Sequence, residues 1–117
     1  MQLDEIRSLC LSFPGSTEDV KWDHHLCFSI GGKVYIFTEF EPPFHSSIKV
    51  LPDEFEELTS RPGIQSSPYM GRYNWIKIDG FEYLSDSEWR HYLRQSYYLV
   101  RVKLPAGVRK KLEALTG

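Results

Sequence analysis

The side chains best suited to chemistry are His24, His25 and Cys27, which lie close together and could bind a metal. A zinc site needs three or four such ligands that converge on one centre. The residues around them have the pattern of a strand, in which neighbouring side chains point to opposite faces, so His24 and His25 would diverge. No second His/Cys cluster in the sequence completes the set. We therefore expect partly exposed histidines, with neither a metal nor another cofactor.

Nucleophilic catalysis has little support in the sequence. The pairs Ser46-Ser47 and Ser66-Ser67 lack the flanking glycines of a nucleophile elbow. Cys10 would need a histidine that only the fold could bring beside it. The Gly31-Gly32 pair lacks the spacing of a phosphate-binding loop. We therefore name no catalytic residue and expect the protein not to be an enzyme.

Basic side chains are concentrated near the C-terminus. The 117 residues contain 14 Lys and Arg and 16 Asp and Glu, which gives a net charge of -2. Half of the cations fall in residues 90–111, a stretch without Asp or Glu. Such asymmetry indicates an anionic partner, although solvated helix faces explain it equally well. With Lys33 added from a predicted hairpin tip, the candidate phosphate contacts are Lys33, Arg90, Arg94, Arg101, Lys103, Arg109, Lys110 and Lys111.

Aromatic side chains accompany some of these cations. Tyr97 and Tyr98 lie between Arg94 and Arg101, and rings beside cations suit stacked bases of nucleic acid. The alternative is that the large aromatic residues belong to the core, with their polar tips hydrogen-bonded. For Trp75 and Trp89 we favour the core.

The elements that would carry these residues can be located from periodicity. Residues 3–13 have helical spacing and end at Pro14-Gly15. Residues 26–30 and 33–38 read as strands joined by Gly31-Gly32, a strong hairpin signal. The expected cross-strand pairs are Ile30 with Lys33, Phe28 with Tyr35 and Leu26 with Phe37; Cys27 and Ile36 would share the other face.

The rest of the chain alternates between short strands and helices. We expect a strand at 46–51, a helix at 53–59, a long loop at 61–73 and a strand at 74–79. Ser85 and Glu88 have the spacing of a capping box that starts a helix. Its buried face would carry Trp89, Tyr92, Leu93 and Ser96. Pro105 opens a last helix with a buried stripe of Val108, Leu112 and Leu115. Segregated strands and helices predict an α+β fold in which flanking helices cover a single antiparallel sheet.

Size and composition predict one domain over residues 1–117. Two cysteines, Cys10 and Cys27, are too few for a disulfide framework, so we expect both to be reduced. The sequence shows neither a signal peptide nor an apolar run of membrane-spanning length, and we expect a cytoplasmic protein.

Several segments, in this order, resemble the MmcQ/YjbR family of small bacterial proteins. They are Phe13-Pro14-Gly15-Ser16-Thr17-Glu18, Lys21-Trp22, the Gly-Lys turn into Val34-Tyr35, Ile48-Lys49-Val50 before Pro52, Pro68-Tyr69, Asn74-Trp75, and the run from Gln95 to Pro105. The resemblance implies a two-layer fold like that of secretion chaperones. It also implies DNA binding through a "double wing" of hairpins around a helix, and it supplies no catalytic residues. Asp23-His24-His25 departs from the small or Gly-containing turn of the family.

Two functions remain open at this stage. The first is DNA binding through the eight candidate cations. The second is a protein-interaction module, in which the sheet or an exposed Phe44 in the loop 40–44 holds a partner segment. The sequence leaves the oligomeric state open.

Overall fold

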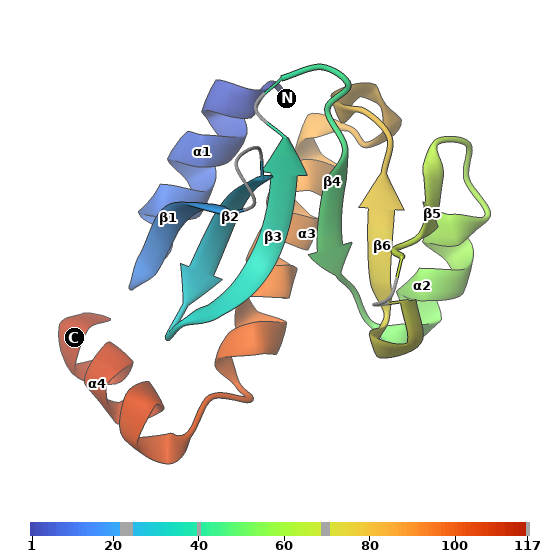
Figure 1. Cartoon of the computed structure of the whole chain (residues 1–117). Helices are drawn as coiled ribbons and strands as arrows, with labels where there is room; N and C mark the ends of the chain where they lie inside the picture. Colours follow the sequence, from blue (N-terminus) through green and yellow to red (C-terminus); the bar gives the residue numbers. More distant parts are fainter. Residues whose placement is uncertain (22–24, 40, 69–70, 117) are drawn as a thin grey trace.

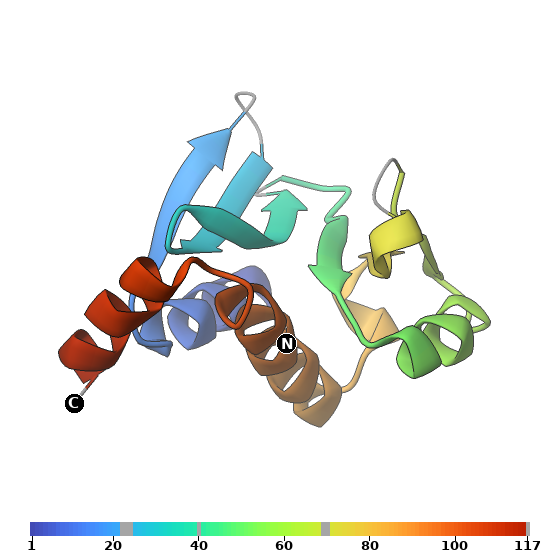
Figure 2. The same cartoon turned by 90° about the horizontal axis from the view of Figure 1, so that it is seen from below.

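The chain forms one antiparallel sheet with helices packed on one of its faces (Figure 1, Figure 2). The computed structural model describes residues 1–21, 25–39, 41–68 and 71–116. Its helices are α1 (Leu3–Ser12), α2 (Pro52–Thr59), α3 (Asp86–Arg101) and α4 (Ala106–Thr116). Its strands are β1 (Ser16–Lys21), β2 (His25–Ile30), β3 (Lys33–Glu39), β4 (Ser46–Lys49), β5 (Ile64–Ser66) and β6 (Trp75–Ile78), and single 3-10 turns span Gly71–Tyr73 and Phe81–Tyr83.

The strands lie in the order β1-β2-β3-β4-β6-β5, and every pairing is antiparallel. The first four strands are thus neighbours in chain order, and β6 lies between β4 and the edge strand β5. The long helix α3 crosses the middle of the sheet and contacts β2, β3 and β4. Helix α1 contacts β1, while α2 contacts β5 and β6. This arrangement confirms the predicted α+β class with a single antiparallel sheet. Within the described residues, no helix is both long and apolar enough to cross a membrane.

The predicted hairpin forms, but its register differs from the expected one. Gly31 and Gly32 turn with φ angles of 57° and 83°, which glycine adopts without steric cost. Ile30 pairs with Lys33 as expected. Beyond that pair, Phe28 lies opposite Ile36, Leu26 opposite Thr38 and Cys27 opposite Phe37. The expected pairs Phe28–Tyr35 and Leu26–Phe37, and the shared face of Cys27 and Ile36, are therefore wrong.

The cause is a β-bulge between Phe28 and Ser29, which leaves Tyr35 as the extra residue of β3. The Tyr35 side chain is completely buried. Its hydroxyl lies 2.6 Å from the Ser16 hydroxyl and donates to the Cys10 carbonyl oxygen at 3.3 Å. The bulge thus places the Tyr35 hydroxyl in contact with α1 and β1. The spacing of the hairpin residues alone does not reveal this long-range contact.

Two strands, β1 and β5, were not predicted from the sequence. The edge strand β1 carries three charged side chains in six residues, so its pattern resembles a polar loop, yet all six residues pair with β2. Strand β5 has only three residues and lies in the segment expected to be a loop. Both are edge strands, where short length and charge are common because such edges resist aggregation.

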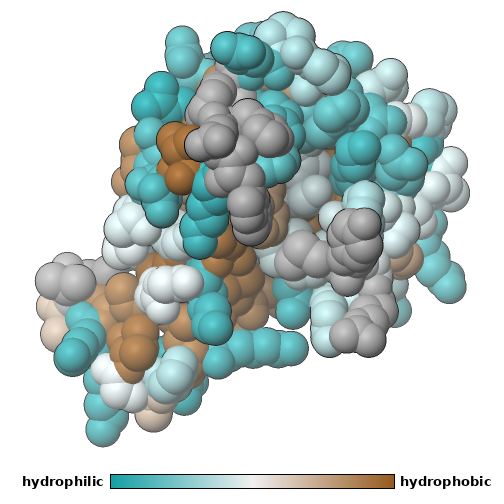
Figure 3. All heavy atoms as spheres, in the orientation of Figure 1, coloured by the Kyte–Doolittle hydropathy of each residue, from teal (hydrophilic) through white to brown (hydrophobic). Residues whose placement is uncertain are grey.

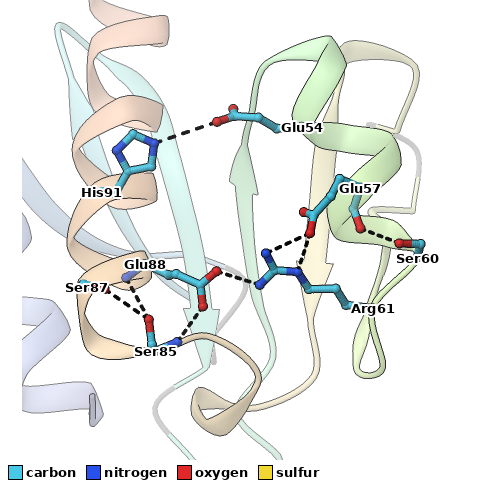
Figure 4. Close-up of polar contacts among 8 residues, drawn as sticks. All are labelled: Glu54, Glu57, Ser60, Arg61, Ser85, Ser87, Glu88 and His91. Atoms are coloured by element: carbon cyan, nitrogen blue, oxygen red, sulfur yellow. Dashed lines mark hydrogen bonds and ion pairs between the residues drawn. The ribbon is translucent and has the colours of Figure 1, made fainter.

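The start of α3 is held by the predicted capping box (Figure 4). The Ser85 hydroxyl accepts from the Glu88 N–H at 3.2 Å, and the Glu88 carboxylate accepts from the Ser85 N–H at 3.0 Å. The Arg61 guanidinium forms two ion pairs, with the Glu88 carboxylate at 2.6 Å and with the Glu57 carboxylate at 2.9 Å. These ion pairs connect the end of α2 to the start of α3. The backbone hydrogen bond from Ser85, followed by Arg61, lowers the pKa of Glu88.

Replacing Glu88 separates its two roles. Glu88→Ala loses the cap and the ion pair, and we expect the free energy of unfolding at pH 7 to fall by about 1–2 kcal/mol. Glu88→Gln retains an oxygen for the Ser85 N–H, so it should lose only about 0.5 kcal/mol. Because the pKa of Glu88 is lowered by folding, its carboxylate stabilises the fold above the unfolded-state pKa, and this stabilisation disappears as pH falls through the folded-state pKa. Urea unfolding of the wild type and both variants at pH 7 and pH 3 measures these stability differences and their pH dependence. A glutamine variant as unstable as the alanine variant would contradict the role of Glu88 as a cap.

Candidate functional site

The His and Cys side chains that the sequence analysis considered as metal ligands, and rejected, do not converge among the described residues. The His25 Nδ1 atom lies 3.0 Å from Glu39 Oε1, across the β2–β3 pair. Cys27 is completely buried and its thiol is free, while His24 lies outside the described residues. Within the part of the chain that the structure describes, no three His, Cys, Asp or Glu side chains surround a common centre.

The Cys10 thiol is also free and completely buried, in α1. Burial raises its pKa to about 12. The thiolate is the nucleophilic form of cysteine, so at neutral pH this side chain behaves as a core residue.

The cations of α3 share one helix face. Arg90, Arg94 and Arg101 are spaced by four and seven residues, which brings them within one stripe along the helix. The exposed Tyr98 lies on the same side. His91 and Gln95 complete the lining of a shallow hollow of about 480 Å³ between Arg90 and Tyr98. Arg90, Arg94 and Tyr98 are exposed, and α3 lies in the layer of helices on one face of the sheet (Figure 2).

The aromatic core positions two of these arginines. The Arg94 guanidinium lies 6.0 Å from the centroid of the Phe13 ring. The Arg101 guanidinium donates to the Tyr97 hydroxyl at 2.9 Å, and that hydroxyl donates to the Pro14 carbonyl oxygen. Tyr97 is completely buried. Core aromatic rings therefore hold the guanidinium groups of Arg94 and Arg101. The guanidinium N–H groups that make no bond within the protein can donate to an external anion.

Arg90 has a different electrostatic environment. It lies about 17 Å along the helix axis from Arg101, since each residue adds about 1.5 Å. There it borders a hollow lined by Asp4 and Glu5 of α1. Its charge also contributes to lowering the pKa of Asp86, although the N-terminal amine at 2.7 Å is the main cause. The structure thus places Arg90 between Arg94, with which it lines the hollow on α3, and the acidic side chains of α1.

Helix α4 is held against the end of the sheet by the hairpin tip. A methyl group at Gly31 would lie 2.7 Å from Leu104 Cδ1 and 2.9 Å from Val108 Cγ1, so the turn and α4 are in close contact. Leu112 approaches Gly15 in the same way. Figure 3 shows hydrophobic atoms where α4 meets the rest of the molecule and hydrophilic atoms along its outer side. This packing confirms Val108 and Leu112 as inward residues; the Leu115 side chain lies outside the described residues.

The three cations of α4 point in different directions. Arg109, Lys110 and Lys111 are exposed and follow one another at about 100° intervals around the helix. Lys110 points away from the Val108–Leu112 stripe, and the other two flank it. One flat partner can therefore contact two of the three. Lys33 is exposed two residues beyond Gly31, beside α4.

Lys49 is a cation near this region that the sequence analysis did not include. It ends β4, 54 residues before Lys103, and both line the same cavity. No local pattern could have identified this neighbourhood, because it depends on where α3 ends relative to β4. The ion pairs of the described residues use Arg7, Arg61, Lys77, the N-terminal amine and three histidines, and none uses Lys49 or any of the eight candidates.

The aromatic residues behave mainly as core. Trp75 is 5% exposed, and the completely buried Trp89 donates from Nε1 to the Phe81 carbonyl oxygen at 2.8 Å. Phe44 is half-buried, with its ring 4.9 Å from that of Phe81. The expectation of an exposed Phe44 is therefore wrong, while Phe40 of the same loop lies outside the described residues.

Comparison with known proteins gives a family model and two similar structures. The YjbR family model matches residues 11–99. A crystal structure of a Deinococcus radiodurans protein with a DUF419 domain is 28% identical, has a TM-score of 0.84, and is matched over 96% of this chain and 88% of that one. A Pseudomonas syringae protein of 19% identity shares the fold with a TM-score of 0.69, over 85% of this chain and 98% of that one. No curated protein matches the sequence.

The docking of α4 on the hairpin tip can be tested with two alanine variants. Gly31→Ala and Gly32→Ala each force alanine into a left-handed conformation, at a cost of about 1–2 kcal/mol. Only Gly31→Ala also meets Leu104 and Val108, since nothing lies near Gly32, and this adds about 1–2 kcal/mol. Urea unfolding measures both variants. In a Leu104→Ala background the difference between them should shrink, and equal costs in the wild-type background would contradict the docking.

Proposed function

This chain belongs to the YjbR family, and we propose that it is a non-enzymatic DNA-binding protein that holds the phosphate backbone against α3 and α4. The proposed contacts are Lys33, Arg94, Arg101, Lys103, Arg109, Lys110 and Lys111. Arg90 takes a peripheral role, because it shares a hollow with Asp4 and Glu5 and its charge also acts on Asp86. A cytoplasmic location is part of the proposal.

The observation that carries the proposal is the absence of carboxylate partners on this surface. None of the seven cations forms an ion pair within the described residues. Elsewhere the pattern differs, since Arg7 pairs with Glu18 at 2.9 Å and Arg61 with two glutamates. Cations that have no internal carboxylate partner can release counterions when they meet phosphates, which favours binding.

The arrangement supports backbone contact better than base recognition. Arg94 is exposed and Arg101 partly exposed on α3, whose C-terminal end leads through Lys103 into α4. Phosphate contacts position a protein on a duplex, whereas side chains at base edges supply specificity. The arginines of α3, held by aromatic rings, and the exposed cations of α4, which point in different directions, are suited to phosphate contact. We therefore expect binding with weak dependence on DNA sequence.

Removing the α4 cations should change the salt dependence of binding. In Arg109→Gln, Lys110→Gln, Lys111→Gln protein, the slope of log K against log salt should decrease in magnitude by about two units, because two of the three side chains can reach one duplex. The fold should remain intact, since exposed substitutions cost within about 0.5 kcal/mol. Fluorescence anisotropy with a labelled duplex at several salt concentrations measures the slope.

A matched control removes paired cations elsewhere. Arg7→Gln with Lys77→Gln takes two positive charges from sites that face Glu18 and Asp79, so it should leave the slope unchanged. An equal loss in both variants would indicate a mere net-charge effect and contradict the proposed surface. If the wild-type protein shows no duplex binding at about 50 mM salt, where the electrostatic term is large, the DNA proposal is wrong and the protein-interaction alternative replaces it.

A further inference from the structure

A second candidate site lies where α3 ends. A cavity of about 300 Å³ is enclosed by three segments that are distant in the sequence. They are residues 49–52 between β4 and α2, residues 73–74 before β6, and the last turn of α3 with Lys103. The volume is at the lower end of the range for small-molecule sites.

Two lysines line this cavity, and none of its described lining residues is Asp or Glu. Lys49 is half-buried and Lys103 is exposed. Burial lowers the pKa of Lys49, and the neighbouring Lys103 ammonium lowers it further. Neither lysine forms an ion pair within the described residues. Two adjacent like charges repel each other, so an anion placed between them would relieve an unfavourable interaction of the empty protein.

The rim of the cavity is apolar and includes an aromatic ring. Val102 is 60% exposed, Tyr73 53% and Leu51 42%, which makes them three of the seven exposed large hydrophobic side chains of the described residues. Exposed apolar side chains are ordinary when scattered, but these three gather around one cavity with two cations. A ligand with a charged end and a flat apolar body fits this combination.

Asn74 adds a polar group on a fixed backbone. Its φ angle is 64°, which makes it the one residue other than glycine with a positive φ among the described positions. The conformation is held because its N–H donates to the Gly71 carbonyl oxygen at 2.9 Å and its carbonyl oxygen accepts from the Val50 N–H at 2.9 Å. Backbone conformations of this kind cluster at ligand sites, and the Asn74 amide lines the cavity.

We propose that this cavity binds a nucleotide, with its phosphate monoester between Lys49 and Lys103 and its base against the Tyr73 ring. A phosphate monoester carries between about 1.5 and 2 negative charges at pH 7, which matches two ammonium groups better than a carboxylate does. Bases stack on aromatic side chains whatever their identity. The cavity shares Lys103 with the proposed duplex surface, whereas Lys49 and Tyr73 belong to the cavity alone, so variants of these two residues test nucleotide binding separately.

The test is a calorimetric titration with adenosine 5′-monophosphate, inorganic phosphate and adenosine. We expect the nucleotide to bind most tightly, inorganic phosphate more weakly and adenosine least. Lys103→Gln lies at an exposed position and should raise the Kd of the nucleotide about tenfold. Lys49→Gln should act similarly, and Tyr73→Leu should weaken the nucleotide but not inorganic phosphate. Arg109→Gln, an exposed cation of α4, is the matched control and should leave the Kd unchanged.

Three results would overturn the proposal: no heat of binding with millimolar nucleotide, adenosine binding as tightly as its monophosphate, or an Arg109→Gln effect equal to that of Lys103→Gln. A short single strand with a 5′-phosphate, compared with its 5′-hydroxyl form, distinguishes the source of the nucleotide. Preference for the phosphorylated strand over the free monophosphate identifies a strand end as the ligand, and the reverse identifies a free nucleotide. If the protein binds the nucleotide but no duplex, the DNA-binding proposal is wrong and the nucleotide proposal is supported.

Discussion

The hydrogen bonds of Ser96, at the middle of α3, hold the structure together where its layers meet. The Ser96 hydroxyl donates to the Tyr35 carbonyl oxygen at 2.6 Å and accepts from the Lys49 N–H at 3.0 Å. One completely buried side chain therefore joins α3 to β3 and β4. A buried hydroxyl that lost these partners would leave unpaired backbone groups as well, at a cost of about 1–3 kcal/mol for each group. This requirement fixes both the rotation and the axial position of α3 on the sheet.

Both proposed sites follow from that placement. With Ser96 and Tyr97 turned inward, helical geometry turns Arg94, Tyr98 and Arg101 toward the outer face. The axial position decides where α3 ends, and Lys103 therefore lies next to Lys49 at the end of β4. The C-terminus of a helix carries a partial negative charge, which favours the cations gathered there. The basic surface and the cavity share Lys103 at this end of α3.

The β-bulge in the hairpin serves the same arrangement. It makes Tyr35 the extra residue of β3 and buries its ring 5.5 Å from that of Tyr97. The hydroxyls of these two tyrosines bond to Cys10 and Pro14, at the end of α1 and just beyond it. Helix α1, the sheet and α3 are thereby locked around one aromatic cluster. The hairpin tip then docks on Leu104 and Val108, so the position of α4 depends on the same strands.

The sequence by itself determined the features that depend on neighbouring residues. Gly31-Gly32 specified the turn, Ser85 and Glu88 the start of α3, and the spacing of Trp89, Leu93 and Ser96 its buried face. It also concentrated cations in the last third of the chain. The tertiary structure alone decided which cations share a surface: it placed Arg90 among the acids of α1 and Lys49 beside Lys103. It also made a strand of the charged β1 and displaced Tyr35 with a bulge. The physical reason is that turns and caps are set by a few consecutive residues, whereas these outcomes depend on strand order and helix placement, which join residues tens of positions apart.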